Sequence, residues 1–158
     1  MPNKRLMAVV VVGFLIIAGL VYFIKDKRSS DTEQFYNDQV PSVQKTNVDF
    51  AKLPDKFPED IPLETDAKIT QNYNSTTPEG HFQATRTFET QLTLAENYGI
   101  YEKFLKDNGW TIIATTNDPG YKMIAGSKDK QNIQVTIDEN KGSSKTKTVS
   151  ISYSELKK

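Results

Sequence analysis

Two patterns of apolar side chains divide this chain of 158 residues. An uncharged apolar run fills residues 6–24, whereas apolar and polar side chains alternate in short segments from Ala67 onward. Alternation is typical of β-strands with one buried and one solvated face, as in an antiparallel sheet. Turn-forming Gly, Pro, Asn and Asp separate the alternating segments, so this pattern predicts a sheet built largely from hairpins.

Six strands and one helix are predicted beyond residue 66. The strands are expected near residues 67–73, 81–90, 110–114, 121–125, 133–137 and 149–153. The helix follows Thr93, which forms a capping-box pattern with Glu96, and it ends at Asn108 and Gly109. Because two strands precede the helix and four follow it, we expect an α+β fold of order ββαββββ. The helix should pack on one face of a largely antiparallel sheet.

The spacing of apolar residues also predicts which side chains are buried. One stripe along the predicted helix comprises Leu94, Tyr98, Tyr101, Phe104 and Leu105. We expect this stripe to pack on sheet residues that include Trp110, Ile112, Val135 and Ile151. In the strand near 121–125, the alternation assigns the apolar face to Tyr121, Met123 and Ala125.

The apolar run at residues 6–24 predicts a transmembrane helix, because a helix of this length spans about 28 Å at roughly 1.5 Å per residue. It is longer than the core of a signal peptide, and no small-residue cleavage pattern follows it. We therefore favour an uncleaved anchor over a cleaved signal or a buried core helix. The predicted organisation is a cytoplasmic tail (1–5), a transmembrane anchor (6–24), a juxtamembrane tether (25–52) and an α+β domain (53–158).

The short cationic tail favours one orientation of this anchor. Lys4 and Arg5 precede the span, and a tail of five residues most simply stays in the cytoplasm. We expect a single-pass protein of the cell membrane whose C-terminal domain lies outside the cytoplasm. Three prolines between residues 54 and 62 then predict an extended entry into that domain, which Phe57, Ile61 and Leu63 would hold against the core.

Three stretches carry a resemblance to a known group of proteins. They are FPEDIPLETDAKIT at residues 57–70, LAENYGIYEKFLKDNGWTI at 94–112 and VSISY at 149–153. They resemble small uncharacterised exported α+β domains of bacterial and archaeal lipoproteins and single-span membrane proteins. The resemblance covers about residues 53–154 and implies an extracytoplasmic α+β domain, with no functional residues to carry over. The chain departs from the lipoprotein members because it has no cysteine for lipid attachment.

Composition excludes several kinds of chemistry. The chain has no cysteine, one histidine (His81) and a formal net charge of zero. Disulfides, thiolate metal sites and multi-histidine sites are therefore excluded, and nucleic-acid binding is disfavoured. The sequence holds no phosphate-binding glycine motif and no nucleophile elbow. We therefore expect no enzyme activity, and no catalytic, cofactor or metal site.

The remaining features favour a membrane-anchored interaction domain that binds another envelope protein through a solvated sheet face or a free edge. The alternative is a small-molecule or lipid-binding sensor with a cleft between helix and sheet, lined by Tyr98, Tyr101 and Trp110. A packed helix–sheet interface would favour the first hypothesis. Arg86 lies on an otherwise apolar strand face. Its guanidinium either reaches water over the sheet edge or contacts an anion or carboxylate.

Overall fold

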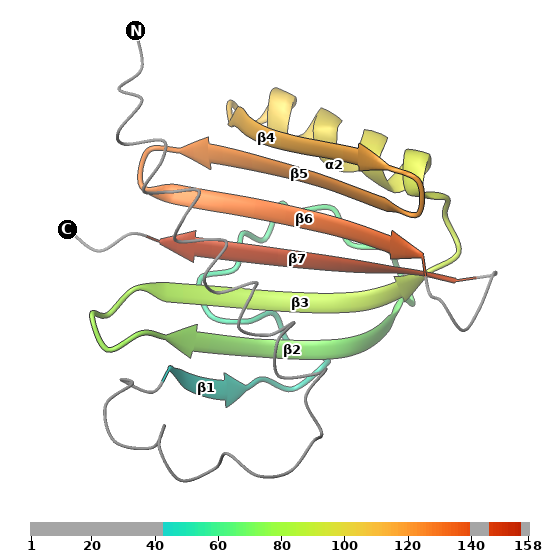
Figure 1. Cartoon of the computed structure of the whole chain (residues 1–158). Helices are drawn as coiled ribbons and strands as arrows, with labels where there is room; N and C mark the ends of the chain where they lie inside the picture. The colour runs from blue at the N-terminus through green and yellow to red at the C-terminus, as the bar shows by residue number, and fades with distance from the viewer. Residues whose placement is uncertain (1–42, 140–145, 156–158) are drawn as a thin grey trace, which may run out of the picture. The chain divides into compact units, whose positions relative to one another are not determined.

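The computed structural model describes residues 43–139 and 146–155, which form an antiparallel sheet and a helix (Figure 1). Helix α2 spans Leu94–Asp107. The seven strands are β1 (Gln44–Asn47), β2 (Lys68–Thr76), β3 (Phe82–Thr90), β4 (Thr111–Asp118), β5 (Tyr121–Lys128), β6 (Gln131–Glu139) and β7 (Lys147–Glu155). Their spatial order is β1-β2-β3-β7-β6-β5-β4. The predicted α+β class, the antiparallel sheet and the helix are confirmed.

Local sequence sets both ends of α2. The Thr93 hydroxyl accepts a hydrogen bond from the backbone N–H of Glu96 (3.2 Å), and the Glu96 carboxylate accepts one from the Thr93 N–H (2.8 Å). At the other end, Gly109 has a φ of +72°, which glycine adopts without steric cost. Tyr101, Phe104 and Leu105 are buried as expected. The hydrogen bonds between Thr93 and Glu96 confirm the capping box that the sequence predicts.

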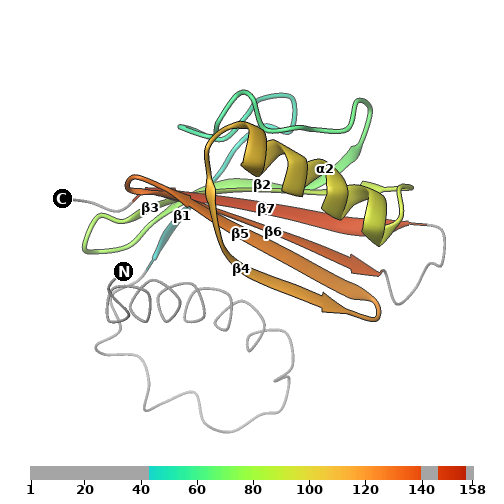
Figure 2. The same cartoon turned by 90° about the horizontal axis from the view of Figure 1, so that it is seen from above.

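The helix and the segment that leads into β2 lie on the same face of the sheet (Figure 2). Helix α2 contacts β4, β5 and β6. The lead-in segment adds Phe57 and Ile61 to a core cluster that also contains Ala84 and Phe88 of β3. No described segment covers the opposite face (Figure 2). The described part of the chain thus has two layers, with the core between them.

The connection through α2 carries the chain from the middle of the sheet to its edge. Strand β3 lies between β2 and β7, whereas β4 is the edge strand at the far side. The chain then returns as successive hairpins from β4 to β7, and β7 pairs with β3 from Phe82↔Glu155 to Thr90↔Lys147. The last strand therefore joins the two halves of the sheet.

Close packing of α2 on the sheet depends on Gly126 of β5. A Cβ atom at this position would lie 3.0 Å from Cδ2 of Leu105 and 3.3 Å from Cβ of Trp110. Glycine in a strand allows such close approach because it has no side chain. Leu105 is completely buried in the same cluster as Ile124, Val135 and Ile151. The interface between helix and sheet is therefore filled by side chains.

Residues 44–52 differ from the sequence prediction, which assigns them to the tether. Strand β1 pairs with β2 from Gln44↔Thr76 to Asn47↔Tyr73, so the folded unit begins before residue 53. All four β1 residues are exposed. A strand that buries neither face shows no alternation of apolar and polar residues, which explains why the pattern does not reveal it.

The alternation also gives the wrong apolar face for β5. The positions that face α2 are Lys122, Ile124 and Gly126, and the Lys122 ammonium lies 5.7 Å from the centre of the Tyr98 ring. Ile124 is completely buried. Met123 and the other odd-numbered residues of this strand lie on the opposite face, because successive side chains alternate. A lysine and a glycine on the core face conceal its burial from the sequence pattern.

The predicted anchor at residues 6–24 and the tail before it lie outside the described residues. Among residues 43–139 and 146–155, the structure holds no helix with the length and apolar character that a bilayer crossing requires.

Candidate functional site

The sheet face opposite α2, here called the helix-free face, presents neutral polar side chains on its three central strands. These residues are Gln83, Thr85 and Thr87 of β3, Ser150 and Ser152 of β7, and Gln134 and Thr136 of β6. They alternate with core residues along each strand, as the pleat of a β-strand requires. The sequence predicts a solvated face, but none of these seven side chains is fully exposed. Thr85 (3% exposed) and Thr87 (6%) are buried, and the other five are half-buried.

Strand register aligns these side chains in two rows. Thr85 lies opposite Ser152, which lies opposite Gln134; in the second row, Thr87, Ser150 and Thr136 follow each other in the same way. The hydroxyl oxygens of Thr85 and Ser152 are 3.3 Å apart, and those of Thr87 and Ser150 are 3.0 Å apart. A hydroxyl has one donor and two acceptor positions. The hydroxyl pair in each row can therefore hydrogen-bond internally and still offer further hydrogen-bonding positions to a polar partner.

Larger side chains flank the two rows. Tyr73 of β2 lies opposite Thr85, and Met123 of β5 lies opposite Thr136. Tyr121 lies two positions before Met123 on the same face of β5. Burial raises the pKa of Tyr121, and the carboxylates of Asp138 and Asp118 raise it further. Its hydroxyl thus stays protonated at neutral pH and can donate a hydrogen bond.

Arg86 lies on the opposite, core face of β3, where it binds backbone carbonyl groups. Its Nη1 donates to the carbonyl of Lys52 (2.8 Å) and to Oδ1 of Asn72 (3.1 Å), and its Nη2 donates to the carbonyl of Phe50 (3.0 Å). Only 8% of Arg86 is exposed. The expectation that its guanidinium reaches water is therefore wrong. Burial lowers the pKa of Arg86, and none of the ion pairs found among the described residues involves it.

Asn72 completes this arrangement from β2. Its side-chain amide donates to the carbonyls of Asp49 (2.7 Å) and Lys52 (2.9 Å). Arg86 and Asn72 lie opposite each other in the β2–β3 register. Together they donate to the carbonyls of Asp49, Phe50 and Lys52 in the turn at residues 48–52, which we call the β1 turn. Contact of Arg86 with an anion or carboxylate remains a prediction.

The other predicted contact residues surround the packed helix. The Tyr101 hydroxyl donates to the carbonyl of Pro62 (3.1 Å), and burial, with a smaller effect of Glu64, raises the pKa of Tyr101. Trp110 is buried against β5. Tyr98 is half-buried beneath the Lys122 ammonium. These three side chains lie around one helix–sheet interface and pack into it. Their contact with a ligand stays a prediction.

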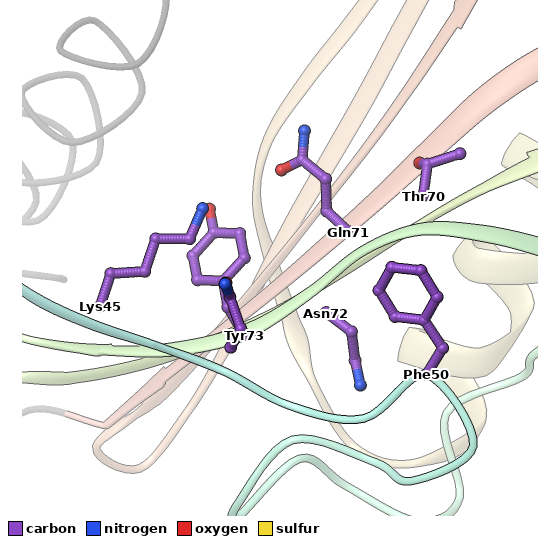
Figure 3. A pocket seen from close by; sticks show the side chains of 7 residues that line it. Lys45, Phe50, Thr70, Gln71, Asn72 and Tyr73 are labelled. Carbon is purple, nitrogen blue, oxygen red and sulfur yellow. The ribbon is translucent and has the colours of Figure 1, made fainter.

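A shallow hollow of about 490 Å³ lies instead at the edge of the sheet, where β1 ends (Figure 3). Its lining residues are Lys45, Asn47, Phe50, Thr70, Gln71, Asn72 and Tyr73. The Lys45 ammonium lies 3.8 Å from the centre of the Tyr73 ring, within cation–π distance. Across the described residues, no three His, Asp or Glu side chains are grouped as metal ligands would be.

Residues 70–147 match a family model described as START domain-like. Searches among curated proteins and among solved structures give no match. The START domain-like match covers just under half of the chain, from β2 to the first residue of β7. It does not bear on the resemblance to exported lipoprotein domains, which stays a prediction.

The matched segment contains α2 and most of the helix-free face, but not β1 or the β1 turn. Sequence reasoning identifies the polar face from alternation but overlooks the hollow, because its residues Lys45, Asn47 and Phe50 fall in the predicted tether. The pairing of Asn72 with Arg86 also escapes it. Both residues lie at core positions of neighbouring strands, which is the signal that could have revealed the pair.

Proposed function

We propose that this chain is a non-catalytic binding domain, tethered to a membrane by residues 6–24, whose helix-free face binds another envelope protein. The observation that carries the proposal is the array of neutral hydroxyl and amide groups on β3, β7 and β6, which no described segment covers. The domain would then lie outside the cytoplasm, as the short cationic tail predicts.

The chemistry of this face suits coverage by a partner. None of the seven central positions is charged, and the charged residues on the same face of these strands, Glu89 and Asp138, lie near the strand ends. Neutral polar groups cost far less free energy to remove from water than charged groups do, provided that they find new hydrogen-bond partners. Hydroxyl and amide groups offer both donors and acceptors for this purpose. The packed interface beneath α2 also favours a surface partner over a ligand buried in that interface.

The START domain-like match favours a second candidate, a small-molecule or lipid-binding sensor. START-like folds often bind small molecules or lipids. Because Leu105 and Trp110 fill the space above Gly126, such a ligand would bind the helix-free face, or it would bind only after α2 moves away. The polar rows suit a small hydroxylated molecule better than an acyl chain, because an acyl chain would leave their hydrogen-bonding groups unpaired.

Site-specific photo-crosslinking in the native cell tests the proposal. A photoreactive amino acid replaces either Ser152 on the helix-free face or Lys103 on the exposed side of α2. We expect a discrete protein adduct from position 152 and none from position 103. Introducing the bulky variant Thr136→Trp into the Ser152-labelled chain should abolish that adduct, because residue 136 lies in the row next to Ser152.

Two results would overturn the proposal. Equal adducts from both positions would mean that contact is not confined to the helix-free face. Absence of a protein adduct, together with a thermal shift of the whole chain by a small hydroxylated compound that Thr136→Trp removes, would establish the sensor instead. The exposed variant Lys130→Trp, on the β5–β6 turn, controls for the effect of adding an indole.

A further inference from the structure

Exposed apolar side chains are concentrated near β1. Three large hydrophobic residues are exposed in the described part of the chain, and two of them, Val43 (49% exposed) and Phe50 (52%), flank this four-residue strand. The third, Ile100, lies on α2. Isolated exposed apolar residues are ordinary, but two on either side of one short edge strand form a candidate contact surface.

In the sequence, one cationic residue, Lys45, lies between Val43 and Phe50. Lys45 is exposed, lines the hollow beside Phe50 and lies over the Tyr73 ring. None of the ion pairs among the described residues includes Lys45. Two apolar side chains, an aromatic ring and an available ammonium group match the interface of a bilayer. There the apolar groups enter the acyl boundary, and cations attract anionic headgroups.

The structure holds Phe50 in its exposed position. From the buried face of the sheet, Arg86 donates to the Phe50 carbonyl, and Asn72 donates to the carbonyls of Asp49 and Lys52. These hydrogen bonds fix the backbone of the β1 turn while the Phe50 ring remains exposed. Burial of a guanidinium costs free energy. The hydrogen bonds from Arg86 to the β1 turn offset part of that cost and hold the turn in place.

Chain length determines what this edge can reach. Only 18 residues separate the predicted anchor, which ends at Ile24, from Val43. Even fully extended, they reach about 65 Å at roughly 3.6 Å per residue. A surface tethered so near the bilayer has a high effective concentration there, so weak contacts suffice for docking.

We infer that Val43, Lys45 and Phe50 form a docking edge through which the domain lies against an anionic lipid surface. The inference rests on the anchor in the proposed function and adds a second, reversible contact to it. Docking would orient the domain by its β1 edge and leave the rest of the helix-free face available to a partner.

The full chain reconstituted in lipid nanodiscs provides the test. The protein has no cysteine, so Asn47→Cys creates one site beside the edge for a polarity-sensitive dye, and Ile100→Cys creates a control site on α2. In discs of phosphatidylcholine with phosphatidylglycerol, we expect a blue shift at position 47 and none at 100. The shift should weaken in discs of phosphatidylcholine alone and at high salt, because lipid charge attracts Lys45.

Variants of the docking edge separate the contribution of the Lys45 charge from that of the apolar Phe50 ring. Lys45→Gln should lower the ratio of docked to undocked protein about fivefold, the effect of one cation near an anionic surface. Phe50→Ser should lower that ratio at any lipid charge, whereas Lys130→Gln on a distant turn should leave it unchanged. Circular dichroism of each variant verifies that it remains folded.

The outcomes distinguish failure of the edge from failure of the anchor. If the chain migrates with the discs but the dye at position 47 does not respond, the docking edge is wrong while the anchor stands. If the chain does not migrate with the discs, both fall. If glycerol phosphate without lipid gives the same shift, the hollow binds a soluble anion, and the bilayer contact is overturned.

Discussion

Arg86 and Asn72 illustrate how polar side chains can belong to the core of this protein. Both are buried, and they donate to backbone carbonyls of the β1 turn at distances between 2.7 and 3.0 Å. A buried donor or acceptor without a partner costs about 1–3 kcal/mol. The pair thus stabilises the domain by preventing that cost at several carbonyl groups at once.

Replacing Arg86 should therefore destabilise the domain. Arg86→Met keeps much of the side-chain volume but leaves the Phe50 carbonyl without its donor, while the Lys52 carbonyl keeps only the Asn72 amide. We expect the free energy of unfolding to fall by about 1–3 kcal/mol, with relief of the buried charge offsetting part of the loss. Denaturant melts measure this change. Lys45→Met, at an exposed lysine, should stay within about 0.5 kcal/mol of the parent; an equal loss in both variants would contradict this account of Arg86.

At the scale of elements, the sequence predicts those helices and strands whose formation depends on residues close to one another in the chain. Helix α2 is predictable because Thr93 and Glu96 act on each other within one turn and its stripe follows the helical period. Strand β1 is not, because it is held by hydrogen bonds to a distant partner rather than by burial of its own side chains. The rows of the helix-free face also escape prediction, since the register of Thr85 against Ser152 depends on two strands far apart in sequence.

The packing of α2 gives a prediction at this scale. Phe104 is 7% exposed and faces the sheet with Leu105. Phe104→Ala should lower the free energy of unfolding by about 3–5 kcal/mol, because truncating a buried phenylalanine removes apolar contacts and leaves a cavity. Chemical denaturation of both variants compares it with Lys103→Ala, whose solvated ion pair with Asp107 contributes about 0.5 kcal/mol or less. A neutral Phe104→Ala variant that no longer captures a partner would instead identify the stripe as a binding surface.

For the molecule as a whole, the extent of the folded unit exceeds the sequence prediction. Residues from Pro41 to Lys158 cluster as one compact unit, and the β1 turn is tied to Arg86 and Asn72. Residues 44–52 thus belong to the sheet and do not merely link it to the predicted anchor. The two edges of the sheet also differ in length: β1 has 4 residues and β4 has 8, and neither has a further partner strand among the described residues.

Two truncated chains test this boundary. A chain that begins at Pro41 should unfold cooperatively, whereas one that begins at Leu53 should lose about 2–4 kcal/mol of unfolding free energy. The shorter chain lacks β1 and leaves donors of Arg86 and Asn72 unsatisfied. Thermal and denaturant melts monitored by circular dichroism compare the two. Equal midpoints and slopes would mean that residues 41–52 add nothing to the stability of the domain.

The pairing of β3 with β7 has a consequence for how the protein folds while it is being synthesised. Arg86 lies opposite Ile151, so the central ladder joins segments separated by more than sixty positions, and such contacts form slowly because a long loop must close first. A chain emerging from the ribosome presents the β2–β3 hairpin, then α2 and the β4–β6 hairpins, each with an unpaired strand edge. Only the final segment can cover both edges. Nascent chains halted before β7 should therefore be the most prone to aggregation and proteolysis.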